Sequence, residues 1–415
     1  MLHAFLASLM TCLSAMPAAA GLSASSLPLE RTSAAALSGP QERIKGRHYT
    51  LVFDTDRDVA QRVSRHMDAV HEEYTKRFST FGVRNARPMT LYLFQTNRGY
   101  IEFLGSHGFN AANTGGLFFV GDDIQGVATY IEGQSESRIL EVLQHEAFHL
   151  FAFLRIHRDL PVWIDEGIAE WFGASYMVKN RLITGVAPSR PLLNVKQAIR
   201  NNTHFPLTEL VNMTSEEWGR VVNSGSAKTS LMYDQAWSLT HFLIEGDRGK
   251  YARLFMQYLQ DLRNGVQPPR AFEAAFGKDT DALEKAWKDF ILDLEPDALV
   301  TARDRLDFLA AGLKYLHDNG QTPANIEELR ARLRAVQFVR TTIMHGVRIR
   351  MDARDDDHFT PPPSPIRGKT SQLRLTPAEA ETLPPGIELT GLRVTIRVEW
   401  RRDELGELHS RIVME

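Results

Sequence analysis

The chain has 415 residues and a formal net charge of −3, with 43% hydrophobic and 24% charged residues. This length suggests two or three domains and at least one sizeable core. The balanced charge, without a polybasic run, argues against nucleic acid or an acidic membrane surface as the main partner.

The first 20 residues are typical of a secretory signal peptide. An apolar run up to Met16 is followed by Ala18, Ala19 and Ala20, although no Lys or Arg precedes it. The run is too short for a membrane span, and the only cysteine, Cys12, lies within it. We therefore expect export to a bacterial periplasm or medium, and a mature chain without a disulfide or a stable membrane span.

Residues 21–45 are rich in Ser, Ala and Pro and are expected to form a flexible leader. Residues 46–176 are expected to form an α/β subdomain, in which a small mixed sheet leads into a buried helix from Ser137 to Arg155. A long amphipathic helix is expected from Asp56 to Phe78. Four segments indicate strands: Tyr49–Phe53, Met89–Phe94, Gly115–Val120 and Val127–Ile131.

The second half of the chain has a different pattern. Residues 177–298 follow the helical period between Gly and Pro breaks and are expected to form a helical subdomain. Residues 299–415 are expected to be an α/β extension with two helices, a strand near 340–351, a loop at 355–365 and a closing hairpin at 392–414. No motif in this extension indicates a catalytic or metal-binding role. Its function is left open, and docking of a cell-envelope partner is one alternative. The predicted fold class is α+β.

One motif in the buried helix points to chemistry. His145-Glu146-Ala147-Phe148-His149 places two imidazoles one turn apart on one helix face, with a carboxylate beside them. This arrangement predicts a zinc site, with Glu146 able to reach a water at the metal. The alternative is a buried helix whose two histidines only hydrogen-bond their neighbours.

A catalytic zinc site needs three protein ligands and one open position. Glu166 follows Pro161 in the first turns of a second apolar helix, and packing of the two helices can aim its carboxylate at the histidines. The sequence here resembles the gluzincin zinc peptidases, in which HExxH is followed by Trp-x-x-Glu-Gly-x-Ala, represented by Trp163, Glu166, Gly167 and Ala169. The resemblance implies a thermolysin-like core with one zinc ion, His145, His149 and Glu166 as ligands and Glu146 as the base.

Two further residues have weaker support. Glu170 lies one turn after Glu166 and is a candidate partner for the second nitrogen of a metal-bound histidine, or else an ordinary exposed acid. Asp165 is less well placed for that role. The segment from Tyr233 to Leu243 resembles the helix that carries the catalytic tyrosine of aminopeptidase-type gluzincins, so Tyr233 is the candidate oxyanion donor. It can also be a helix-start aromatic in contact with solvent.

The resemblance covers about 250 residues, from Tyr49 to Leu294, and extends to exported bacterial proteins with a gluzincin core. The Gly-x-Met-Glu-Asn segment that captures a free amino terminus in aminopeptidases is absent, and Thr114–Phe119 stands there instead. We therefore expect an exported zinc-dependent endopeptidase, rather than an aminopeptidase, that acts on peptides or proteins added as a strand beside Leu117–Val120. The alternative is a catalytically inactive gluzincin-like scaffold or binding protein.

Overall fold

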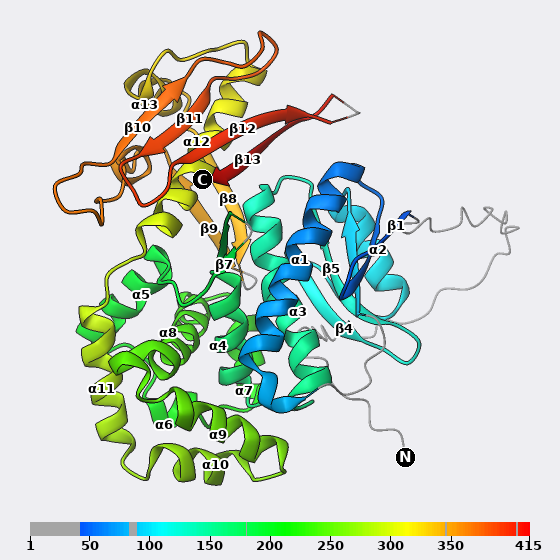
Figure 1. The fold of residues 1–415 in the computed structure, drawn as a ribbon, viewed down its shortest axis with the longest axis vertical. Coiled ribbons are helices and arrows are strands. Elements are labelled where there is room, and N and C mark those ends of the chain that lie inside the picture. Colours follow the sequence, from blue (N-terminus) through cyan, green and yellow to red (C-terminus); the bar gives the residue numbers. More distant parts are fainter. Residues whose placement is uncertain (1–41, 83–88, 180, 345–346, 404–405) are drawn as a thin grey trace, which may run out of the picture.

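The computed structural model describes residues 42–82, 89–179, 181–344, 347–403 and 406–415. These residues form a sheet-containing part, a helical part and a C-terminal unit, which follow one another along the chain (Figure 1). The predicted signal peptide and most of the predicted leader lie outside the described residues. The α+β class is confirmed, because an N-terminal sheet is followed by a run of helices and then by a second sheet.

The first part is built on a five-stranded mixed sheet with the order β1-β2-β3-β5-β4. The inner pairs β2–β3 and β3–β5 are parallel, whereas β1 and β4 are antiparallel strands at the two edges. The strands are β1 (Glu42–Lys45), β2 (Tyr49–Phe53), β3 (Met89–Phe94), β4 (Gly116–Val120) and β5 (Gln125–Tyr130). The position of β4 is important because its outer edge has no partner strand among the described residues.

Helices cover both faces of this sheet. The helices α1 (Arg57–Arg77) and α3 (Glu136–Arg155) pack on one face, where their buried stripes meet Leu51 and Leu91 in the main core. On the other face, α2 (Asn97–Ser106) packs with Phe119 in a smaller cluster. A short 3-10 turn, η1 (Ser79–Phe81), follows α1. The predicted helices Asp56–Phe78 and Ser137–Arg155 are confirmed to within a residue or so at each end.

The helical part begins with α4 (Val162–Gly173), which packs against both α3 and α8. A small hairpin, β6 (Tyr176–Val178) and β7 (Arg181–Ile183), follows it. The remaining helices of this part are α5 (Ser189–Arg200), α6 (Leu207–Leu210), α7 (Ser215–Asn223), α8 (Ala227–Gly249), α9 (Ala252–Arg263), α10 (Pro268–Phe276) and α11 (Thr280–Asp293). One apolar core runs without a break from the sheet through these helices.

The C-terminal unit is built around a second core, to which Ala174, Tyr176 and Val186 of the helical part also contribute. Its helices α12 (Ala298–Asp318) and α13 (Ile326–Ala335) pack near a four-stranded antiparallel sheet. The strands of that sheet are β10 (Gln372–Thr376), β11 (Gly386–Thr390), β12 (Ile396–Arg402) and β13 (Leu408–Met414). A separate hairpin, β8 (Val339–Met344) and β9 (Val347–Asp352), extends from this unit toward α3 and α4 (Figure 1).

The structure corrects four details of the sequence interpretation. Residues 42–45, assigned to the leader, form β1, because they complete the edge of the sheet beside β2. The single strand expected near 340–351 is the β8–β9 hairpin, and the loop expected at 355–365 contains a 3-10 turn, η2 (Asp356–Phe359). The closing hairpin is confirmed as β12 and β13, but β10 and β11 extend it to a four-stranded sheet.

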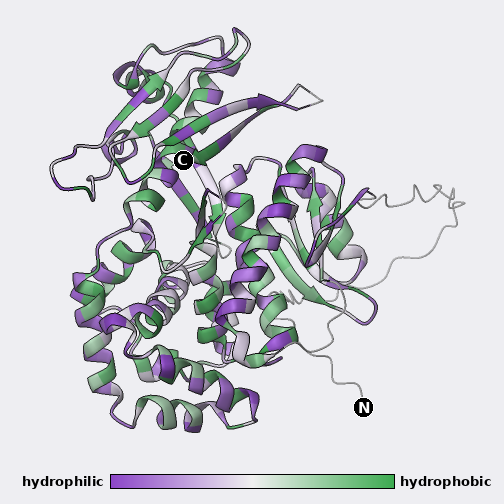
Figure 2. Cartoon of the chain, in the orientation of Figure 1, coloured by the Kyte–Doolittle hydropathy of each residue, from purple (hydrophilic) through white to green (hydrophobic). Residues whose placement is uncertain are grey.

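The helices throughout the fold mix hydrophilic and hydrophobic residues (Figure 2). This is the pattern of helices with one face in a core and the other in water. Within the described ranges, none of the helices combines the length and the apolar character that crossing a membrane requires.

Candidate metal centre

The two histidines are positioned by α3, whose start is fixed by a local cap. The hydroxyl of Ser135 accepts a hydrogen bond from the backbone of Arg138, and the acidic Glu136 lies in the first turn, where the helix dipole favours negative charge. The apolar face of α3 is buried against the sheet and α1. Its other face therefore presents His145 and His149, four residues apart, toward α4.

The structure brings the three predicted ligands together. The Nε2 atoms of His145 and His149 lie 3.1 Å apart, and Oε2 of Glu166 on α4 lies 3.4 Å and 3.6 Å from them. Their candidate ligand atoms all lie within 4.8 Å of one another. Two imidazoles and one carboxylate that converge from neighbouring helices, with one side open, match the donor set of a catalytic zinc site.

The other nitrogen of each histidine is held by a carboxylate, as is usual for metal-binding histidines. Nδ1 of His145 lies 2.9 Å from Oε1 of Glu170, and Nδ1 of His149 lies 3.0 Å from Oδ2 of Asp165. Glu170 therefore contacts a ligand and is no exposed acid. The sequence interpretation of Asp165 was wrong, because α4 enters at an angle that brings its first turn against His149.

The carboxylates also set the charge of the centre. Burial lowers the pKa of His145, but Glu166 and Glu170 outweigh burial and raise that pKa to about 10. The pKa of His149 is likewise raised, because Asp165 and Glu166 outweigh burial. Burial raises the pKa of Glu166, yet the two histidines bring it down to about 2. The surroundings thus favour positive charge between these groups, which is the electrostatic requirement for a bound cation.

The relative position of α3 and α4 is fixed by Gln144, a residue that the sequence interpretation did not single out. Its buried side-chain amide donates to the carbonyls of Phe172, Gly173 and Ser175 at 2.9–3.1 Å, and so caps the end of α4. Its oxygen lies 2.6 Å from Nε2 of His66 on α1. This network holds α4, and with it the Glu166 carboxylate, against the histidines.

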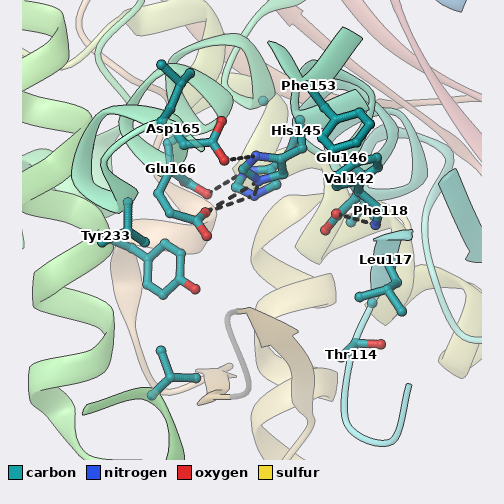
Figure 3. Close-up of a pocket in the computed structure, with 18 of the residues that line it drawn as sticks. Thr114, Leu117, Phe118, Val142, His145, Glu146, Phe153, Asp165, Glu166 and Tyr233 are labelled. Atoms are coloured by element: carbon teal, nitrogen blue, oxygen red, sulfur yellow. Dashed lines mark hydrogen bonds and ion pairs between the residues drawn. The ribbon is translucent and has the colours of Figure 1, made fainter. Parts of the chain in front are cut away.

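Close packing of α4 on α8 brings Tyr233 to the site. A Cβ at Gly167 would lie 2.3 Å from Oγ1 of Thr240 and 2.6 Å from the carbonyl oxygen of Ala236, so the two helices can approach this closely only at a glycine. Tyr233 consequently lines the same cavity as the ligands, and its hydroxyl points into the open space (Figure 3). Burial, reinforced by the Glu166 carboxylate, raises its pKa well above 10 and keeps it a proton donor.

The candidate base, Glu146, bridges the metal helix and the edge strand. Its Oε2 accepts a hydrogen bond of 2.8 Å from the backbone N–H of Phe118 on β4 (Figure 3). The helix and the strand touch here because of Gly116, at which a Cβ would lie 2.3 Å from Cγ1 of Val142 and 3.3 Å from Cγ of Glu146. The carboxylate is thereby held beside both the ligands and the unpaired edge of β4.

These groups share one cavity of about 380 Å³. Its wall is formed by β4, α3, the loop before α4, the start of α4 and Tyr233, together with Ile343 from the C-terminal hairpin. Apolar side chains such as Phe118, Phe153 and Leu160 alternate there with the carboxylates. The cavity therefore combines apolar surface with a few convergent polar groups, which is the usual character of a substrate site.

His241 on α8 lies outside this cavity. It is buried between Trp237 and Phe290, and its Nδ1 atom has no hydrogen-bond partner among the described residues. Burial lowers its pKa to about 4, so the ring is neutral. Its role is packing, and the hydrogen bond expected for it is missing at Nδ1.

The geometry thus defines a candidate metal centre with an acid beside it and a buried tyrosine facing it. Comparison with known families agrees with this class: the model of the peptidase MA superfamily matches residues 70–293, more than half of the chain. The chain therefore belongs to the peptidase MA superfamily. The matched region contains the three candidate ligands and the side chains of Glu146, Asp165, Glu170 and Tyr233. A search of curated proteins found no match.

Proposed function

We propose that this chain is an exported zinc metallopeptidase of the gluzincin type, and that it acts as an endopeptidase. The observation that carries the proposal is the convergence of His145, His149 and Glu166, with a carboxylate behind each imidazole. A scaffold protein has no need to keep all five groups in contact. Membership of the peptidase MA superfamily supports peptide or protein substrates.

Each remaining group then has a role in hydrolysis. A zinc ion held by the three ligands would lower the pKa of a water molecule and polarise the peptide carbonyl. Glu146 accepts the proton of that water and passes it to the leaving amine, and its hydrogen bond from Phe118 keeps it oriented for both transfers. Tyr233, protonated at all working pH values, donates a hydrogen bond to the oxygen that becomes negative.

The edge of β4 supports binding of extended peptides. Because the Phe118 N–H donates to Glu146 and main-chain groups alternate along a strand, the backbone of Gly116 and Val120 also faces the open edge. A substrate strand can pair there beside the metal centre. The segment Thr114–Phe119 offers no side-chain carboxylate for a free amino terminus, which favours cleavage within a chain. Export rests on residues 1–20 of the sequence.

The test uses the mature chain and two matched glutamate variants. The wild-type protein is expected to hold about one zinc ion per chain and to cleave peptides from a mixed pool, whereas Glu146→Gln should keep the zinc and lose cleavage by about 10²-fold or more. Glu136→Gln is the control, because Glu136 lies on the same helix but pairs with Arg62 away from the cavity. Stoichiometric zinc without cleavage of any peptide would exclude the enzyme and leave a metal-binding scaffold.

Tyr233→Phe separates the role of the tyrosine from that of the base. Removal of one hydroxyl is expected to lower kcat by about 10²-fold with little change in KM, because the donor acts mainly in the transition state. The ring itself stays packed against Trp218, so the variant should fold normally. An unchanged kcat would assign Tyr233 to packing alone.

A further inference from the structure

One wall of the cavity comes from outside the matched family region, which ends at residue 293. Ile343 on β8 lines the same cavity as the metal ligands. Its carbonyl oxygen accepts a hydrogen bond of 3.1 Å from Nη2 of Arg138 on α3. The same carbonyl oxygen lies near Gly115, the residue before β4, since a Cβ added there would lie 3.9 Å from it. The C-terminal unit thus reaches the residues that begin β4.

The C-terminal unit, which carries the hairpin, is held against the rest of the protein by several contacts. Asp307 on α12 accepts a hydrogen bond of 2.8 Å from Ser135, the residue that caps α3. Arg401 on β12 pairs with Asp56, the residue that caps α1. At the base of the hairpin, Nε of Arg334 donates to the carbonyl of Ala353 at 2.9 Å. The C-terminal unit is therefore tied to the starts of two helices of the catalytic part.

Ile343 lies where a long peptide bound along the edge of β4 would have to pass. A strand added to β4 would run about 4.8 Å from it, along the open edge. Near Gly115 that strand would meet Ile343, which lines the same cavity. Arg138 is seven residues before His145, which is about 10 Å along the helix. An extended peptide covers that distance with about three residues.

We propose that the β8–β9 hairpin is a specificity element of this peptidase: it closes the end of the cleft at Gly115 and limits the substrate to about three residues beyond the scissile bond on that side. The hairpin sets no such limit on the opposite side, toward Val120 at the other end of β4. The inference rests on the proposed peptidase function. Cleavage is then still expected within a chain, at bonds with no more than about three residues on the side that faces Gly115. The C-terminal unit thereby has a part in substrate selection.

The test shortens the hairpin without changing its register. Thr342 and Ile349 face each other across the hairpin, so residues 343–348 can be replaced by Asn-Gly, a sequence that favours a two-residue turn. The change removes two residue pairs and shortens the hairpin by about 7 Å, which is room for about two further substrate residues. The matched control is Arg334→Lys, which alters a guanidinium–carbonyl bond at the base of the same hairpin, away from the cavity.

Two measurements use one set of peptides that carry one to six residues on either side of a common scissile bond. In the wild type and Arg334→Lys, kcat/KM should fall by about tenfold or more when one side exceeds about three residues, and only on that side. In the shortened variant the fall should move outward by about two residues. An identical length dependence in all three proteins would overturn the proposal.

The second measurement does not need cleavage. Peptide hydroxamates of the same lengths are titrated into the zinc-loaded proteins by calorimetry, and their Kd values should show the same limit and the same outward shift. If no protein cleaves any peptide but the Kd limit moves with the hairpin, the proposed function fails and the hairpin inference stands. If cleavage occurs and neither limit moves, the hairpin inference fails and the peptidase stands.

A misfolded shortened variant is recognised by loss of zinc. In that case two point variants replace the deletion: Ile343→Trp should lower the length limit of the substrate, and Ile343→Gly should raise it.

Discussion

The clearest prediction concerns Asp165 and Glu170, the carboxylates behind the two histidines. Each orients one imidazole and makes its Nε2 a better donor to the metal. Their contacts, 3.0 Å to His149 and 2.9 Å to His145, are short enough for charge-assisted hydrogen bonds. Asp165→Asn and Glu170→Gln keep the size of the side chains but remove the charges. Neither substitution touches the metal position itself.

We expect each variant to bind zinc about 10–100-fold more weakly, the usual effect of removing such a partner. That range corresponds to about 1.4–2.7 kcal/mol at 25 °C. Because both acids act on one ion through histidines that are 3.1 Å apart and share Glu166, their effects should be non-additive in the double variant. The assay is competition for zinc against a chromophoric chelator at fixed pH and ionic strength.

Glu284→Gln is the matched control for this experiment. Glu284 also contacts a histidine, His204, at 3.1 Å, but it does so between α11 and the segment before α6, outside the cavity. Its substitution can lower the melting temperature, whereas the Kd for zinc should stay within about twofold of wild type. If the Asp165 and Glu170 variants also stayed within about twofold, the contacts would be structural only and our reasoning about the centre would be refuted.

Three further predictions follow from the packing and the pKa shifts. Zinc binding should release protons near neutral pH, because the pKa values of His145 and His149 are raised in the absence of metal. The apparent affinity for zinc should therefore fall as pH falls. Calorimetry in buffers of different ionisation enthalpy measures the protons released, and no release would contradict the pKa shifts. The free energy of unfolding should decrease as pH falls from 6.5 toward 4, because the pKa of His241 in the folded protein, about 4, lies below its usual value. His241→Leu should remove up to about 3 kcal/mol of this loss and move the midpoint of acid unfolding to a lower pH. An unchanged midpoint would argue against a role of His241 in acid unfolding. Gly167→Ala should force α4 and α8 apart and lower the free energy of unfolding by about 1–3 kcal/mol, as measured by denaturant titration. A variant as stable as the wild type would show that the two helices can separate without loss of stability.

The sequence by itself determined the parts of the site that depend on local geometry. The two histidines share a face because any α-helix places residues four apart one turn apart, and the apolar period of α3 decides which face is buried. Glu166 could be found because a second apolar helix follows after a short loop. The same local reasoning gave β2, β3 and α1 nearly to the residue.

Only the tertiary structure decided which residues support that site. Gln144 contacts the end of α4, Asp165 contacts His149, and Phe118 donates to Glu146, each through packing between separate elements. The approach of β4 to α3 required Gly116, a residue that by itself signals only backbone freedom. Such contacts leave no periodic signal, because the partners are brought together by core packing rather than by spacing along the chain.

The C-terminal unit shows this limit most clearly. Its sequence indicates helices and strands but no chemistry, and it predicts one strand where the structure has the β8–β9 hairpin. Ile343 lies some two hundred positions after the metal ligands and reaches their cavity only because α12 and β12 dock on the starts of α3 and α1. The spacing of residues along the chain therefore determines the metal ligands, whereas packing between distant segments determines the walls of the cleft. The free energy that holds those walls in place comes from contacts that exist only in the folded chain.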